Sequence, residues 1–180
     1  MKILSTLSKL SVITVIMLLT YAAVQQTYRA NANDPQIQMA RDLIGHLTAG
    51  KTIEHIFPAD SIDISKSLGV FAVLYNHNSM PVRSSGFLNG NAPRLPAGVF
   101  DFTKSHGEDM VTWQPQLGVR MAMVLGSVQS PDVAFVAVGR SLKEVEIRES
   151  NLLAMVFISW LICVGTIMIN ELIQSSFKKK

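Results

Sequence analysis

Cysteine is almost absent from this chain: among its 180 residues there is one, Cys163. That residue lies within a long apolar run, so the polar part of the chain can form neither a disulfide nor a thiolate metal site. The polar part must therefore be stabilised by packing.

Sequence signatures of catalysis and of metal binding are also missing. The four histidines share no ligand spacing, and we interpret the methionines at 80, 110, 121 and 123 as core residues rather than copper ligands. The run Ser84-Ser85-Gly86 lacks the first glycine of a nucleophile elbow, and the chain contains no phosphate loop or dinucleotide fingerprint. We expect a protein that is not an enzyme and has no metal or cofactor.

Charge is missing from two stretches, residues 10–28 and 152–170, which bracket the polar middle of the chain. A bilayer core about 30 Å thick is crossed by about 20 mostly apolar residues in a helix, and both stretches come close to that length. The sequence therefore predicts two transmembrane helices, at residues 10–28 and 151–170.

Lysines outside these stretches predict the orientation. Lys2 and Lys9 precede the first stretch and residues 178–180 are all lysine, which favours cytoplasmic termini. We expect a two-pass inner-membrane protein with a cytoplasmic segment at 1–9, an extracytoplasmic domain at 29–150 and a basic cytoplasmic tail at 171–180. These five lysines are among the sixteen basic residues, so the net charge of +3 indicates lipid headgroups rather than nucleic acid as partner.

The first apolar stretch has an alternative interpretation as a cleavable secretory signal, with small residues at Ala22-Ala23 or at residues 30–32. Its apolar run, residues 10–24, is at the upper end of length for such a signal, which favours retention.

No kinase, cyclase or DNA-binding module follows the second stretch, so we expect the output to pass through a partner protein.

The middle of the chain predicts a mixed fold. Apolar residues at three- and four-residue steps from 37 to 47 indicate an amphipathic helix that ends near Gly50. Apolar runs at residues 69–75 and 81–88 indicate a hairpin, and further runs at 110–113, 119–128 and 133–138 complete about five strands. The expected fold class is α+β.

The last of these runs leads directly into the second apolar stretch. Ser141 and Glu144 have the spacing of a capping box, and Val145 continues an apolar heptad pattern into the membrane segment. We expect a stiff signalling junction at Arg140, Glu144 and Val145. Arg140 has two interpretations here: a structural contact to carbonyls or to Glu144, or one element of a switch.

Several short motifs resemble those of PAS-like (PDC or Cache-type) extracytoplasmic sensor domains of bacterial two-component histidine kinases. They are residues 84–90, 95–99, 111–115, 118–120 and 139–146. The resemblance implies a single PAS-like domain with a central five-stranded antiparallel sheet between two transmembrane helices, here without the kinase module. It also implies sensing of a small molecule or envelope condition.

Five residues are candidates for ligand binding: Arg120, Trp113, Tyr75, His77 and Ser85. A guanidinium at Arg120 could hold a carboxylate or phosphate, although an internal ion pair with Glu108 or Asp109 is the favoured alternative. Trp113 could line a pocket or belong to the core. His77 lies at a predicted strand end where polar side chains could converge on a ligand, but the asparagines beside it are also typical of an ordinary turn.

Two classes of function remain from the sequence. The first is a sensor-like domain that signals through its membrane helices to a partner membrane protein or a separate kinase. The second is a structural or assembly subunit that binds nothing small, and a remnant of a kinase gene is a third, weaker possibility. The bilayer is an expected partner in each case, and self-association into a homodimer is possible through the stalk helices.

Overall fold

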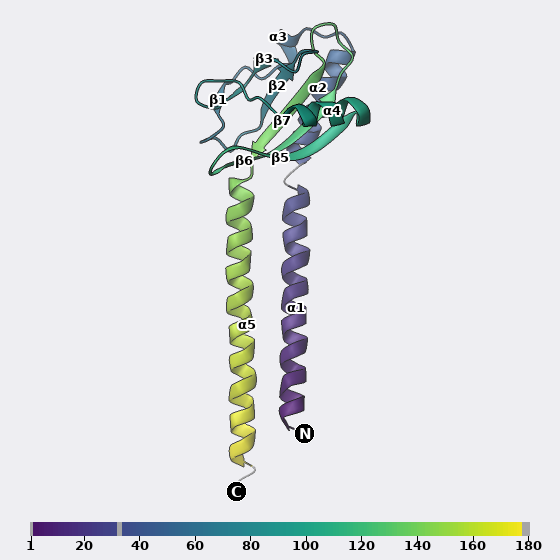
Figure 1. Ribbon diagram of the computed structural model, residues 1–180. Coiled ribbons are helices and arrows are strands. Elements are labelled where there is room, and N and C mark those ends of the chain that lie inside the picture. The colour runs from purple at the N-terminus through teal and green to yellow at the C-terminus, as the bar shows by residue number, and fades with distance from the viewer. Residues whose placement is uncertain (1, 32–33, 178–180) are drawn as a thin grey trace. The chain divides into compact units, whose positions relative to one another are not determined.

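The computed structural model describes residues 2–31 and 34–177. Residues 178–180, the three lysines of the predicted basic tail, lie outside the described part. Helices and strands follow one another along the chain as shown in Figure 1. In chain order they are α1 (Lys2–Asn31), α2 (Asp34–Thr48), α3 (Ile53–Ile56), β1 (Ile62–Asp63), β2 (Phe71–Tyr75), β3 (Pro81–Ser84), β4 (Gly86–Phe87), α4 (Ala97–His106), β5 (Glu108–Gln116), β6 (Val119–Ser127), β7 (Phe135–Ser141) and α5 (Lys143–Phe177).

The chain divides into two compact units. One, which we call the sheet unit, is Ala30–Glu144. The other, which we call the helix unit, combines Met1–Arg29 with Val145–Lys180.

The sheet unit is built on a five-stranded antiparallel sheet with the order β3-β2-β7-β6-β5 (Figure 1). The predicted α+β class and the five-stranded antiparallel sheet are therefore confirmed. β7 is the central strand and pairs with β2 on one side and β6 on the other. A second, two-stranded sheet pairs β1 with β4 in parallel.

Both faces of the main sheet are covered, which explains why every residue of β2 is buried. Successive side chains of a strand point to opposite faces. Phe71, Val73 and Tyr75 belong to the core that contains Phe100 of α4, on what we call the α4 face. The alternate residues of β2 belong to the core that contains Leu43 of α2, on what we call the α2 face.

The predicted amphipathic helix at residues 37–47 is confirmed by α2, which buries Ala40, Leu43 and Leu47. Its apolar stripe has the helical spacing that packing against a sheet requires. Gly50 follows the helix with φ of 73°, a left-handed conformation that glycine adopts without steric cost.

The predicted strand at residues 81–88 is wrong in one respect, because the run is divided between two sheets. β3 ends at Ser84, and Gly86 begins β4, which pairs with β1 instead of β2. A Cβ at Gly86 would lie within contact distance of the Phe71 ring and 2.8 Å from the Cγ2 of Ile64. The core side chains therefore occupy the space that a regular strand residue would need.

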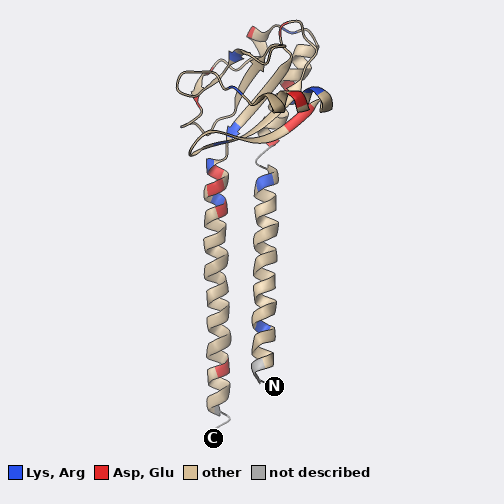
Figure 2. Cartoon of the chain, in the orientation of Figure 1, with Lys and Arg blue, Asp and Glu red and all other residues tan. Residues whose placement is uncertain are grey.

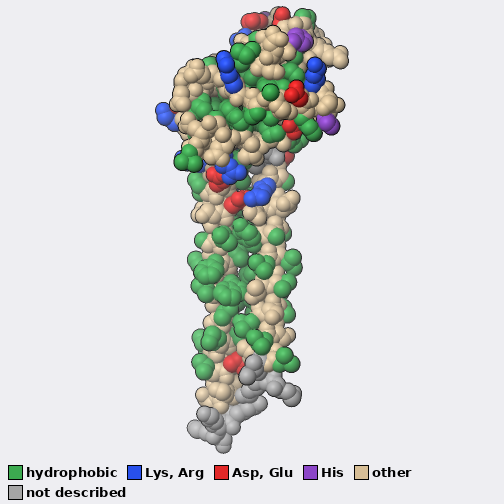
Figure 3. Space-filling model, in the orientation of Figure 1, with side chains coloured by type: hydrophobic (Ala, Val, Ile, Leu, Met, Phe, Trp, Pro, Cys, Tyr) green, Lys and Arg blue, Asp and Glu red, His purple; other side chains and the backbone are tan. Residues whose placement is uncertain are grey.

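The helix unit contains the two uncharged stretches. The structure has two helices that are long and apolar enough, by length and composition, to cross a membrane, and their apolar parts lie in α1 and α5. Figure 2 shows that the charged residues of α1 and α5 lie near their ends, and Figure 3 shows hydrophobic side chains over the interval between. Most of these apolar side chains are exposed, as expected of a surface that faces lipid.

Gly139 of β7 gives a test of how tightly the α4 face is packed. A Cβ there would overlap the sulfur of Met123 and come 2.5 Å from the Phe71 ring, so Gly139→Ala should lower the free energy of unfolding by about 1–3 kcal/mol. The control is Gly45→Ala on α2, where a Cβ meets nothing within 4 Å, and it should raise that free energy by about 0.5–1 kcal/mol. Urea unfolding followed by tryptophan fluorescence measures both, and equal effects would contradict the packing described for β7.

Candidate functional site

A pocket of about 400 Å³ lies at one end of the sheet unit. It is bounded by the turn after β2, by α4, and by the connection from β6 to β7. Its lining residues are His77, Ser79, Phe100, Asp101, Lys104, Ser127, Val128, Gln129, Ala134 and Phe135.

The turn that carries His77 is held by one side chain, Asn76. The Asn76 Oδ1 accepts hydrogen bonds from the backbone N–H of Asn78 and of Met80, each at 3.0 Å. Ser79 lies in the left-handed region with φ of 59°, inside this braced turn. The exposed imidazole of His77 is thus presented from a fixed backbone.

Aromatic rings form the apolar wall of the pocket and continue into the core. The rings of Phe100 and Phe135 meet edge to face at 5.2 Å, and Tyr75 meets Phe100 in the same way at 5.0 Å. This geometry is the favoured one for aromatic pairs. A ligand over Phe100 and Phe135 would therefore rest on a rigid surface.

The polar groups of the pocket are free to bind. Within the described residues, no hydrogen bond or ion pair engages the side chains of His77, Lys104 or Gln129. Asp101 lies three residues before Lys104 on α4, so one positive and one negative group stand on the same side of this helix. The pocket thus offers a cation, an anion and neutral polar groups around an aromatic wall.

Two of the five predicted ligand-binding residues lie at this pocket. His77 lines it directly, and Tyr75 lies behind Phe100 with its hydroxyl donating to the Pro93 carbonyl at 2.9 Å. Burial raises the pKa of Tyr75 above its ordinary value, because the phenolate would be desolvated there. Tyr75 is therefore a supporting residue of the pocket.

The structure does not bring Arg120 together with Trp113 and Tyr75. Its neighbours Val119 and Met121 belong to the core of the α4 face, so the Arg120 side chain starts from the opposite face of the sheet. Its carbonyl accepts a hydrogen bond from the N–H of Leu142 at 2.9 Å, which places it beside the end of β7. Glu108, one suggested ion-pair partner, pairs with Arg41 at 3.3 Å.

Trp113 and Ser85 also lie away from the pocket lining. Trp113 is partly buried and packs against the core of the α4 face. The Ser85 hydroxyl is buried and accepts a hydrogen bond from the backbone N–H of Ala72 at 2.9 Å. Ser85 thereby satisfies the backbone of β2 at the point where the chain leaves the main sheet.

Sequence reasoning missed Asp101, Lys104, Ser127 and Gln129 as pocket residues. They come from α4, from the end of β6 and from the turn after it, segments that are distant in sequence. Ser130, Pro131 and Asp132 are residues typical of a turn, but nothing in the sequence indicates that this turn lies beside α4.

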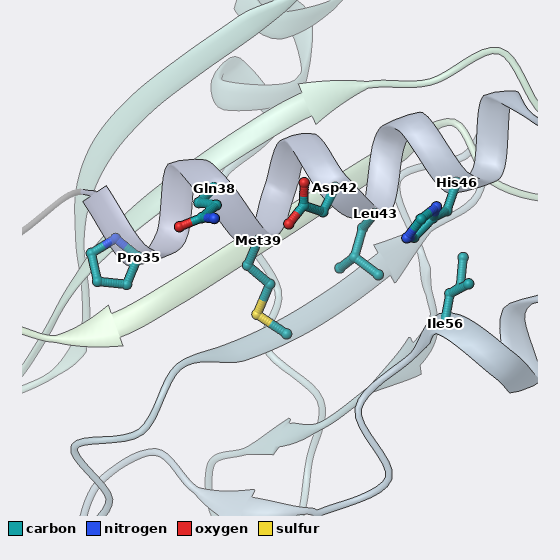
Figure 4. Close-up of a pocket in the computed structure, with 7 residues that line it drawn as sticks. All are labelled: Pro35, Gln38, Met39, Asp42, Leu43, His46 and Ile56. Atoms are coloured by element: carbon teal, nitrogen blue, oxygen red, sulfur yellow. The ribbon is translucent and has the colours of Figure 1, made fainter.

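A second hollow runs along α2 and reaches α3 (Figure 4). Its volume is about 340 Å³, and its apolar residues Met39, Leu43 and Ile56 are bordered by Asp42 and His46. Figure 4 shows the Met39, Leu43 and His46 side chains following one another along α2, with Ile56 coming from α3. The hollow is largely open to solvent rather than enclosed. Such a groove suits an apolar side chain of a protein partner better than a small polar molecule.

At the first turn of α2, Gln36 is completely buried, and neither atom of its amide has a hydrogen-bond partner in the described part of the chain. An unsatisfied buried amide is costly. Hydrogen bonding is therefore incomplete at the start of α2.

The predicted signalling junction is a short connection from β7 to α5. The Ser141 hydroxyl accepts from the backbone N–H of Lys143 at 3.3 Å, as expected of a helix cap. The Arg140 guanidinium donates to the Glu144 carboxylate at 3.0 Å and to the Leu68 carbonyl at 3.3 Å. Both contacts proposed for Arg140 from the sequence, to a carbonyl and to Glu144, are present.

Neither known families nor curated proteins supply a relative: no family model matches the chain, and no curated protein does. The site is therefore argued from its own geometry.

The junction predicts a measurable role for Arg140. Arg140→Ala removes two hydrogen bonds, one of them to a partly exposed carboxylate, and should lower the free energy of unfolding by about 1–2 kcal/mol. Arg94 is exposed, so the control Arg94→Ala should change it by less than about 0.5 kcal/mol. Chemical denaturation of both variants distinguishes them, and equal values would show that the Arg140 contacts are not structural.

Tyr75 predicts a loss of stability at alkaline pH. Because its pKa is higher in the folded than in the unfolded chain, the folded state keeps a proton that the unfolded state loses above pH of about 10. Stability should therefore be unaffected below that pH and fall as the pH rises above it. Thermal unfolding of the wild type and of Tyr75→Phe between pH 8 and about 11.5 tests this; the variant should fall less steeply, and parallel curves would contradict it.

Proposed function

We propose that this chain is a membrane-anchored, PAS-like sensor domain. It detects a small molecule or an envelope condition on the extracytoplasmic side of the inner membrane. It signals through its two membrane helices to a partner membrane protein or to a separate kinase of a two-component system.

The observation that carries this proposal is the path of β7. Its first residue, Phe135, lines the pocket, and its last residues, Arg140 and Ser141, form the junction to α5. Seven residues of strand span about 20 Å, so one rigid segment connects the polar pocket to the start of the long helix.

The position of β7 supports transmission along it. It pairs with β6 along its whole length and with β2 from Phe135 to Gly139, and the same five residues are buried. A strand segment that is paired on both edges and packed on both faces resists local deformation. A change at the pocket end therefore displaces the strand together with its neighbours.

The element order supports the resemblance to PAS-like sensors. A helix precedes the five-stranded antiparallel sheet, and a long apolar helix follows its last strand after one intervening residue. These are the features that the short sequence motifs implied. Cytoplasmic termini and an outward sheet unit follow from the lysines at both ends.

A structural or assembly subunit is the second candidate, and the groove along α2 favours it. Met39 and Ile56 line this open groove on the surface of the sheet unit, where a protein partner could dock. In this function the pocket beside Lys104 would stay empty.

Ligand binding to the full chain in lipid nanodiscs separates the two functions. A panel of small extracytoplasmic metabolites should contain at least one that raises the melting temperature, because a ligand that binds only the folded state stabilises it. Lys104→Ala should weaken that ligand at least about tenfold through loss of its charged contact. Lys51→Ala removes an exposed lysine outside the pocket and should leave binding unchanged.

Two results would contradict sensing. One is the absence of any stabilising compound together with a partner that cross-links in constant proportion under every growth condition, which would support the assembly function. The other is a ligand whose affinity falls equally in Lys104→Ala and Lys51→Ala.

A further inference from the structure

Among the residues that the structure describes, polar contacts between side chains join the two long helices of the helix unit, and three of them are spread along the helices. The Lys9 ammonium lies 3.1 Å from the Glu171 carboxylate. The Trp160 indole N–H donates to the Thr14 hydroxyl at 3.0 Å, and the Arg29 guanidinium donates to the Glu149 carboxylate at 2.7 Å. The contacts advance along α1 while they go back along α5, as in an antiparallel pair.

The two ion pairs stand at the borders of the uncharged intervals. No charged residue occurs between Lys9 and Arg29 on α1, or between Glu149 and Glu171 on α5 (Figure 2). At about 1.5 Å per helical residue these intervals are roughly 30 Å and 33 Å long. Both lengths match the hydrocarbon thickness of a bilayer, so one ion pair falls at each membrane surface.

The third contact lies inside the interval. A tryptophan N–H in hydrocarbon has no water to bind and needs a partner within the protein. The Thr14 hydroxyl supplies this partner from the facing helix by accepting the hydrogen bond. This contact therefore fixes the rotation of α5 at a depth that neither ion pair reaches.

From these contacts we infer that α1 and α5 form a helical hairpin within one chain, whose register is locked by Lys9–Glu171, Thr14–Trp160 and Arg29–Glu149. Sliding α5 by one helical turn along α1, about 5.4 Å, breaks all three contacts together. The helices therefore move as one body, by tilting or turning, and not by one sliding past the other. That consequence for signalling rests on the proposed function, whereas the lock itself does not.

The distance between spin labels on the two helices measures the register. The full chain carries Cys163→Ala with Gln26→Cys and Ser159→Cys, both exposed positions of the helix unit, and is labelled and studied in lipid bilayers by pulsed electron resonance. We expect one narrow distance distribution.

The membrane orientation is predicted from the lysines at the two ends of the chain. The charges of Arg29 and Glu149 can therefore be exchanged without changing the residues that orient the chain.

Arg29→Glu and Glu149→Arg should each broaden the distribution or shift it by about 5 Å, one turn of slippage. The double reversal restores opposite charges and should return the narrow distribution. Lys51→Glu, in the sheet unit, is the charge-matched control and should change nothing. Single reversals without effect, or a double reversal that stays as broad as the singles, would overturn the lock.

Dilution with an excess of unlabelled chain tests whether the hairpin lies within one chain. The narrow distribution should persist, because both labels are on the same molecule. Its loss on dilution would overturn the inference, since the helices would then pair between copies. No ligand is needed in this experiment, so its failure is independent of whether the sheet unit senses anything.

Discussion

The central position of β7 is the constraint on which the sheet unit depends. Its backbone is paired with β2 and β6, and its alternate side chains belong to the cores on the two faces of the sheet. Gly139 leaves room for Phe71 and Met123, so even the one position without a side chain is part of the packing. Because one strand is shared by both cores, the pocket at its start and the junction at its end belong to the same rigid element.

Polarity is used differently in the two units. At the pocket of the sheet unit, Lys104 and His77 face solvent without partners among the described residues. The helix unit instead uses polar groups in pairs, at the borders of its apolar interval and once within it. Under the proposed membrane-anchored function this difference follows from the solvent, because water can hydrogen-bond an exposed lysine whereas lipid hydrocarbon can hydrogen-bond no polar group.

The sequence predicted the elements better than the site. Apolar residues at helical spacing predicted α2, and apolar runs predicted the five strands. An element that buries one face carries apolar residues at a regular spacing, which can be read from the sequence. The prediction of one continuous strand at 81–88 was wrong, because the space beside Gly86 is filled by Phe71 and Ile64, which are distant in sequence. Arg120 and Trp113 were grouped by proximity in the chain, but alternation along β6 sends Arg120 to the opposite face from Trp113 and its partner Met121.

The sequence by itself determined the α+β class, the two long apolar helices and the contact of Arg140 with Glu144 at the start of α5, because each depends on local patterns or on residues a few positions apart. Only the tertiary structure decided which polar residues share a pocket. Lys104 and Gln129 meet through the packing of α4 and the turn after β6, and Thr14 meets Trp160 through the pairing of helices at opposite ends of the chain. Such contacts leave no period or spacing in the sequence, because they are set by the three-dimensional path of the backbone.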